Sequence, residues 1–196
     1  MNKSDTTDIL SILLVSGQQK AAAAIKALLD TSKFRVTEYV QSGANARRLI
    51  LERDYDLILI NSPLPDEKGT DFACHAAEST SAGIVLLVDN GSFDDVCMKC
   101  EPYGIMTISK PFTKAVFEQV LALVSATKRR LFILEKENSK LSRRMEEMKT
   151  VSEAKYILME KKNMTEDEAH KYIEKMSMNQ RVTKTEMAKS IIRMYK

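Results

Sequence analysis

Glycine and proline stop partway along this chain. All six glycines and all four prolines lie at or before Pro111, so the segment from Phe112 to Lys196 contains neither. These two residue types interrupt helices most strongly and are the commonest residues of tight turns. The sequence therefore predicts that the second part of the chain is helical throughout.

The first part alternates short apolar runs with helical patterns. The apolar, β-branched runs cover residues 11–15, 34–40, 56–60, 83–88 and 104–109, and the helical stretches cover 18–30, 43–54, 69–80, 93–104 and 113–130. This alternation predicts an α/β domain in which helices cover both faces of a five-stranded parallel sheet. In such folds the functional crevice lies at the carboxyl ends of the central strands.

Charge is unevenly divided along the chain. Residues 1–124 carry 12 Lys and Arg against 16 Asp and Glu, whereas residues 125–196 carry 18 against 11. A basic second half predicts contact with a polyanion. No run is long and apolar enough to span a membrane, and the polar start MNKSDTTD lacks a signal-peptide core. We therefore expect a cytoplasmic protein with no membrane contact.

The cysteines point to a reducing compartment, because three is an odd count without the density of a disulfide scaffold. Cys97 and Cys100 form a CxxC pair, which is also typical of metal and redox sites. The chain has no second pair, and its two histidines, His75 and His170, lie far away in sequence. We interpret the pair as half-buried thiols of a helix and expect no metal and no cofactor.

An apolar heptad repeat begins near the last proline. With Phe117 at position a, the following a and d positions hold Val120, Val124, Thr127, Leu131, Leu134, Asn138, Leu141, Met145, Met148 and Ser152. This seam predicts a coiled coil over residues 117–152, and an asparagine at an a position favours two strands in one register. The expected dimerisation contacts are Leu131, Leu134, Asn138, Leu141, Met145 and Met148. Docking of the stripe on the chain's own first domain remains an alternative.

Two capping boxes divide the end of the chain. Thr165 with Glu168, and Thr183 with Glu186, each match the S/T-x-x-E signature of a helix start. They predict helices from about residue 166 to 176 and from 184 to 195, which pack against the end of the long helix. The apolar residues expected in this small bundle are Ala154, Ile157, Leu158, Ala169, Tyr172, Ile173, Met176, Met187, Ala188 and Ile191.

The spacing of a few residues links the first part to a known family. Asn61 ends the third apolar run, Pro65 and Gly69 follow it, and Lys110-Pro111 follows the fifth run. On these positions residues 9–127 resemble the receiver domain of bacterial response regulators. The resemblance implies a flavodoxin-like sheet and, as an input partner, a sensor kinase or another regulatory protein.

The groups that give a receiver its chemistry are replaced here. The resemblance places the magnesium-binding acids at Ser16 and Gly17 and the phosphate acceptor at Asn61, with Asp89 after the fourth strand and only Lys110 retained. Magnesium requires hard oxygen ligands, and a carboxamide forms no acyl phosphate. We predict a degenerate receiver that is not phosphorylated, in which hydrogen bonds among Asn61, Ser16 and Lys110 hold one state.

Three aspartates are alternative candidates for the missing acids: Asp66, Asp71 and Asp89. The first two lie in the segment that follows Asn61. Their position in a predicted loop favours a solvated surface over a ligand role.

The end of the chain resembles a second family, the ANTAR domain of transcription antitermination regulators. The matching residues are Ala154, Lys155, Leu158, Met159, Thr165, Glu166, Ala169, His170, Ile173, Ser177 and Met178. The resemblance covers residues 151–196 and implies a dimer that holds two hairpins of leader RNA and so favours an antiterminator. The candidate RNA-binding residues are Lys155, Lys161, Lys162, His170, Lys171, Arg181, Lys184, Lys189 and Arg193. The rings of Tyr172, His170 and Tyr195 are candidates for base stacking.

Two other functional classes remain open. A DNA-binding transcription factor would also use short basic helices, although the segment SMNQRVTK lacks the glycine common in a helix-turn-helix turn. A coiled-coil adaptor would carry its basic residues only for solubility. We do not expect an enzyme, because the sequence shows no nucleophile-base pair, glycine-rich phosphate loop or metal cluster.

Overall fold

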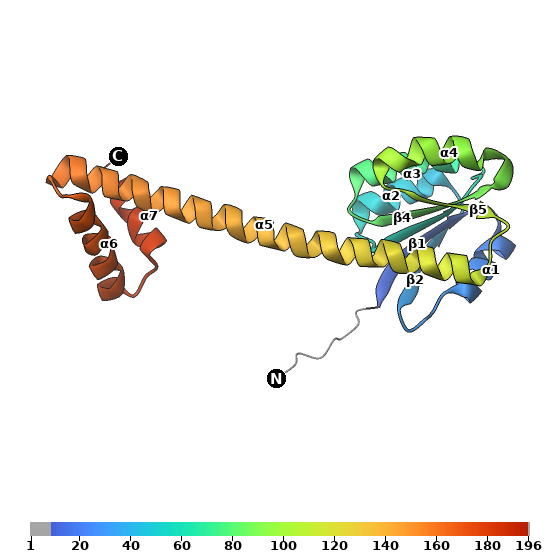
Figure 1. Ribbon diagram of the computed structural model, residues 1–196, viewed down its shortest axis with the longest axis horizontal. Helices are drawn as coiled ribbons and strands as arrows, with labels where there is room; N and C mark the ends of the chain where they lie inside the picture. The colour runs from blue at the N-terminus through green and yellow to red at the C-terminus, as the bar shows by residue number, and fades with distance from the viewer. Residues whose placement is uncertain (1–8, 196) are drawn as a thin grey trace. The chain divides into compact units, whose positions relative to one another are not determined.

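The computed structural model describes residues 9–195. They form two compact units, divided between Leu131 and Phe132, and one helix, α5 (Lys114–Lys162), contributes to both. The first unit contains the sheet, and the second contains the end of α5 and two further helices (Figure 1). Within residues 9–195, no helix is both long and apolar enough to cross a membrane.

The first unit is a five-stranded parallel sheet with the strand order β2-β1-β3-β4-β5. Its elements are β1 (Leu10–Ser16), α1 (Gln19–Leu28), β2 (Phe34–Val40), α2 (Gly43–Glu52), β3 (Leu57–Asn61), α3 (Gly69–Ser79), β4 (Gly83–Asp89), α4 (Phe93–Cys100), β5 (Met106–Lys110) and the start of α5. The predicted α/β fold is confirmed.

Helices cover both faces of this sheet (Figure 1). On one face α2, α3 and α4 pack against residues such as Leu13, Ile58 and Leu86. On the other face α1 and α5 pack against residues such as Ile12 and Leu59, which are next to Leu13 and Ile58 in sequence. Successive strand residues point to opposite faces, so the central strands are apolar in nearly every position.

One predicted helix is shorter than expected. The stretch 93–104 forms α4 only as far as Cys100, and a 3-10 turn, Glu101–Tyr103, follows. Gly104 then adopts a left-handed conformation with φ of 68°, which a residue without Cβ adopts at little cost. The fifth strand therefore begins at Met106, not at residue 104.

The start of α5 belongs to the core of the first unit. Phe117, Leu121 and Val124 are buried against the sheet. Lys128, one turn further, donates to the carboxylate of Asp56 at 2.8 Å and to the carbonyl oxygen of Tyr55 at 3.2 Å. Phe117 and Val124, two positions of the predicted heptad repeat, therefore pack against the sheet of their own chain.

The second unit packs the end of α5 against α6 (Glu166–Gln180) and α7 (Lys184–Tyr195). The buried core holds Ala154, Leu158, Ala169, Ile173, Met187, Ala188 and Ile191, and the other predicted core residues, Ile157, Tyr172 and Met176, pack around it. Both capping boxes are present, since Thr165 and Thr183 exchange hydrogen bonds with Glu168 and Glu186. α6 continues beyond the predicted Met176, through the buried Ser177.

Candidate functional site

Four candidate residues of the first unit are the last residues of their strands. Ser16 ends β1, Asn61 ends β3, Asp89 ends β4 and Lys110 ends β5. Ser16 pairs in register with Asn61, and Asp89 pairs with Lys110. Because the strands are parallel, all four side chains lie at the same edge of the sheet. The register thus brings the four candidate residues to one edge of the sheet, and their role as a site stays a prediction.

A directional chain of hydrogen bonds runs through this crevice. The ammonium group of Lys110 can only donate, and it lies 3.2 Å from Oδ1 of Asn61. The amide Nδ2 of Asn61 then faces Ser16 and donates to its hydroxyl at 3.0 Å. The Ser16 hydroxyl donates to the carbonyl oxygen of Gln18 at 3.2 Å. Ser16 and Asn61 are both buried, and the Ser16 hydroxyl and both polar atoms of the Asn61 amide have hydrogen-bond partners.

Lys110 has two further partners at the crevice. It donates to the carbonyl oxygen of Ser62 at 2.6 Å and forms an ion pair with Asp89 at 3.1 Å. The chain itself therefore provides an anionic partner for Lys110, the carboxylate of Asp89. Sequence reasoning missed Ser62, because a backbone oxygen carries no residue-type signal.

The loop after β3 leaves little room for an acid at position 17. A Cβ on Gly17 would lie 2.7 Å from Cδ and Cγ of Pro65, a separation at which one of the two must move. Asp66 is exposed, as predicted, and it also accepts from the backbone amides of Gly43 and Ala44, each at 2.9 Å. These bonds lower the pKa of the Asp66 carboxyl below its ordinary value and hold the loop on the start of α2.

The same loop is also tied to α2 by an ion pair. Arg47 donates to Glu67 at 2.6 Å and 3.1 Å, with its guanidinium 5.7 Å from the ring centroid of Phe72. Asp71, the other alternative acid, lies exposed in the first turn of α3. These contacts give Asp66 a structural role in capping α2 and leave Asp71 on the surface.

The CxxC pair lies on α4, and Cys100 belongs to the core between this helix and the sheet. Cys97 is half-buried and Cys100 is fully buried. Burial raises the pKa of the Cys100 thiol to about 11, so this group is protonated and a poor nucleophile at neutral pH. Among residues 9–195, no three His, Cys, Asp or Glu side chains gather as a metal site would require.

Some of the basic candidates of the second unit form ion pairs between helices. Lys155 pairs with Glu166 at 2.5 Å and Lys184 pairs with Glu174 at 2.6 Å. These ion pairs lower the pKa of both glutamates, and His170 lies near enough to both carboxylates to add to the effect. These two cations are neutralised within the chain, which sequence reasoning did not anticipate because the partners are on different helices.

Another group of lysines surrounds an aromatic ring. Lys162 places its ammonium 4.8 Å from the ring centroid of Tyr172, and Lys171 and Lys175 follow on α6, both exposed. These two lysines have no ion-pair partner in the part of the chain that the structure describes. Tyr172 is half-buried at the edge of the core. Part of its side chain therefore packs against the core, and part remains exposed.

The remaining basic candidates lie elsewhere on the second unit. Lys161 pairs with Glu160 at 3.3 Å, and Lys189 and Arg193 are exposed on α7. Arg181 ends α6 in a left-handed conformation, with φ of 57°, and its backbone N–H donates to the carbonyl oxygens of Met178 and Ser177. A non-glycine residue in this conformation is uncommon and costs free energy.

The predicted dimerisation residues are all exposed on α5. The exposed fractions are 54% for Leu131, 48% for Leu134, 57% for Leu141, 61% for Met145 and 70% for Met148. Asn138 is exposed with them. An apolar stripe left in water on one helix is the kind of surface that another helix covers.

The sequence matches two families of protein domain. Residues 12–122 match the response regulator receiver domain, and residues 139–192 match the ANTAR domain. The transcriptional regulatory protein PdtaR of Mycobacterium tuberculosis (strain CDC 1551 / Oshkosh) is 25% identical over 181 residues, covering 92% of this chain and 88% of the relative.

Solved receiver domains share the fold of the first unit. The signal receiver domain of an HD domain-containing protein from Pseudomonas fluorescens Pf-5 aligns with a TM-score of 0.57 and 20% identity, over 66% of this chain and 96% of that chain. A CheY-like receiver domain from Methylobacillus flagellatus aligns with a TM-score of 0.51 and 25% identity, over 60% and 99%.

Proposed function

Because the chain belongs to the response regulator family and joins a receiver domain to an ANTAR domain, we propose that it acts as a dimer on leader RNA. Its family is one of RNA-binding antitermination regulators and not of enzymes. In the proposed mechanism two ANTAR domains hold two hairpins of the nascent transcript. The bound antiterminator is then favoured over an overlapping terminator by mass action.

The basic surface of the ANTAR domain is the observation that carries this proposal. Lys171, Lys175, Lys189 and Arg193 are exposed on α6 and α7 and are free to neutralise phosphates, each adding to the salt dependence of binding. The packed core beneath them fixes their helices.

Dimerisation is supported by the exposed stripe of α5 from Leu131 to Met148. In a two-stranded coiled coil these side chains would cover one another, and Asn138 would fix the register. Two linked ANTAR domains turn the second RNA contact into an intramolecular one, which raises affinity without new contacts.

Control without phosphorylation is supported by the crevice of the receiver domain. Asn61 and Ser16 stand where acceptor and metal-binding acid would be needed, and Lys110 already pairs with Asp89. We propose that a sensor kinase or another regulatory protein acts on this domain by contact and not by phosphotransfer.

A gel shift tests the RNA proposal. The full chain is titrated with the leader RNA of its own operon and with duplex DNA of the same sequence, at several salt concentrations. We expect tighter binding of the RNA, weakened by salt. Preference for the duplex would favour a DNA-binding regulator, and no salt-dependent binding to either would favour a coiled-coil adaptor.

A further inference from the structure

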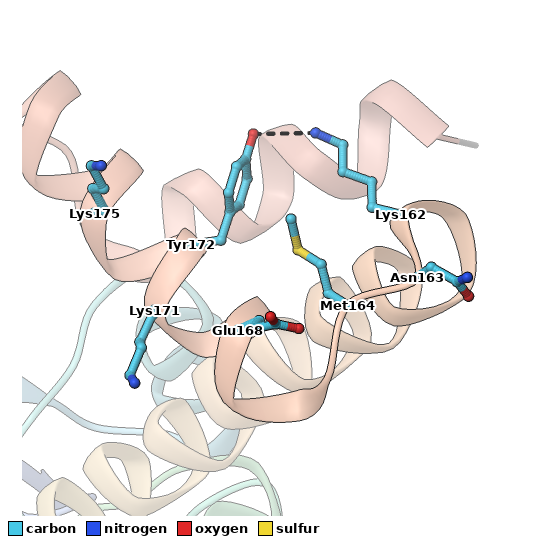
Figure 2. A pocket seen from close by; sticks show the side chains of 7 residues that line it. All are labelled: Lys162, Asn163, Met164, Glu168, Lys171, Tyr172 and Lys175. Atoms are coloured by element: carbon cyan, nitrogen blue, oxygen red, sulfur yellow. Dashed lines mark hydrogen bonds between the residues drawn. The ribbon is translucent and has the colours of Figure 1, made fainter.

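A pocket opens in the second unit where the end of α5 turns into α6. Its volume is about 430 Å³, and it is lined by Lys162, Asn163, Met164, Glu168, Lys171, Tyr172 and Lys175 (Figure 2). This volume falls within the range of roughly 300–1,000 Å³ that is typical of sites for small ligands. It can hold a group of the size of one nucleotide.

One wall of the pocket is the ring of Tyr172, beside which lies the ammonium of Lys162. Lys162 reaches from the end of α5 to Tyr172 (Figure 2), with its ammonium 4.8 Å from the ring centroid and 3.5 Å from the hydroxyl. Met164 points into the space between them (Figure 2). A hydrogen bond of that length is weak, and Lys162 is exposed, so a flat ligand can take its place on the ring.

The charge around the pocket favours an anion. Three lysines line it against one carboxylate, that of Glu168. This carboxylate already accepts from the amide and hydroxyl of Thr165, at 2.8 Å and 2.9 Å. Lys171 and Lys175 are four residues apart and so share one side of α6. Glu166 and Glu174 of the same helix are each already paired with another lysine, Lys155 and Lys184.

We propose that this pocket binds one unpaired nucleotide of the RNA, with its base stacked on Tyr172 in place of the Lys162 ammonium and its phosphates on Lys171 and Lys175. The choice of RNA as the source rests on the proposed function. The recognition of a nucleotide by the pocket does not rest on it, because the pocket requires only a planar base joined to a phosphate. Stacking on aromatic side chains is the usual way in which proteins hold unpaired bases.

The test uses the full chain with ¹³C-labelled methionine methyl groups and three probes: adenosine 5′-monophosphate, ribose 5-phosphate and a short oligoadenylate. A stacked base changes the ring-current field at Met164. We expect the monophosphate and the oligoadenylate to shift the Met164 methyl signal, and ribose 5-phosphate to leave it in place. The proposal would be overturned if only ribose 5-phosphate shifted this signal, or if none of the three probes did.

Variants assign the effect to the ring. Tyr172→Phe keeps the aromatic face and should bind as the wild type does. Tyr172→Leu should weaken binding of oligoadenylate by roughly 5- to 100-fold, with thermal unfolding checked for both. Tyr156→Leu, at an exposed tyrosine of α5 outside the pocket, is the matched control and should change nothing.

The outcomes separate this inference from the proposed function. Leader RNA that binds Tyr172→Leu as tightly as the wild type would overturn the pocket and leave antitermination standing. A wild-type chain that binds adenosine 5′-monophosphate but neither oligoadenylate nor leader RNA would overturn RNA as the source, and would count against the proposed function as well.

Discussion

The side-chain amide of Asn61 donates to the hydroxyl of Ser16 across 3.0 Å and so joins the ends of two neighbouring strands. The receiver resemblance assigns these two positions to a metal-binding acid and to the phosphate acceptor, and we propose that both acids are replaced here. An aspartate at 61 could not make this bond in the same direction, since a carboxylate only accepts. The two replacements therefore fit each other.

Loss of the Ser16 hydroxyl should be costly. A Ser16→Ala variant leaves the buried Nδ2 of Asn61 without its acceptor, so we expect the unfolding free energy to fall by about 1–3 kcal/mol. Urea denaturation measures this. Ser109→Ala, which removes an exposed bond to Asn90, should stay within about 0.5 kcal/mol. Equal losses in both variants would show that the bond between Ser16 and Asn61 contributes nothing particular.

Restoring the acceptor alone should not restore chemistry. An Asn61→Asp variant still lacks the acid pair at Ser16 and Gly17 and so cannot hold magnesium in the usual way. We expect no phosphate adduct after incubation with acetyl phosphate and Mg²⁺, as measured by intact-protein mass spectrometry. An adduct on this variant or on the wild type would refute the degenerate-receiver proposal.

The ion pair between Asp56 and Lys128 should make the first unit sensitive to acid. Burial alone would raise the pKa of Asp56, but hydrogen bonds from Lys128 and Ser11 outweigh it, and the pKa lies below its ordinary value. Because the folded pKa is depressed, its contribution is present above the unfolded pKa, about 3.9, and is lost as the pH falls through the folded value.

An Asp56→Asn variant should therefore be less stable than the wild type at pH 7, by roughly 1 kcal/mol. The difference should shrink as the pH falls below about 4, in urea denaturation at a series of pH values. Asp95→Asn, at an exposed residue of α4, serves as the control. A difference that does not change with pH would exclude the charged form of Asp56 as its cause.

The apolar stripe of α5 should control oligomeric state. Leu141→Ala removes one seam side chain from each of two strands, so we expect the dissociation constant of the dimer to rise by at least about 100-fold. Analytical ultracentrifugation measures it. Leu51→Ala alters a leucine that is 80% exposed on α2 and should leave the dimer intact. A wild type that is monomeric at high concentration would contradict the prediction at once.

Arg181 should show opposite effects on folding and on binding. Its left-handed conformation, with φ of 57°, favours glycine. We therefore expect Arg181→Gly to raise the free energy of unfolding by up to about 1 kcal/mol. The same change removes an exposed cation and should weaken binding of leader RNA. A variant that gains stability and binds RNA unchanged would remove Arg181 from the set of contacts.

Much of the architecture could be predicted because it depends on local signals. The five strands follow from their apolar runs, and the helix starts at Thr165 and Thr183 follow from capping boxes that need only residues three apart. The bundle core was found from helical periodicity. The end of α4 was missed because the left-handed turn at Gly104 lies inside a stretch that reads as helical.

The site could be predicted only where residue type carries the signal. Asn61, Ser16 and Lys110 became candidates through the receiver resemblance, and the ends of parallel strands bring them together at one edge of the sheet. The role of Asp66 in capping α2, the carbonyl of Ser62 and the neutralised pairs of Lys155 and Lys184 were missed. Each depends on elements that only the folded chain brings together.

The pairing of Lys110 with Asp89 has a consequence for signalling over time. A phosphoryl group arrives from outside and leaves by hydrolysis, so its presence reports the recent past. Asp89 belongs to the same polypeptide, and its local concentration around Lys110 is the same in every molecule at every moment. If the receiver domain is not phosphorylated, as we propose, it keeps no record of a past stimulus, and we expect its output to follow the amount of the protein.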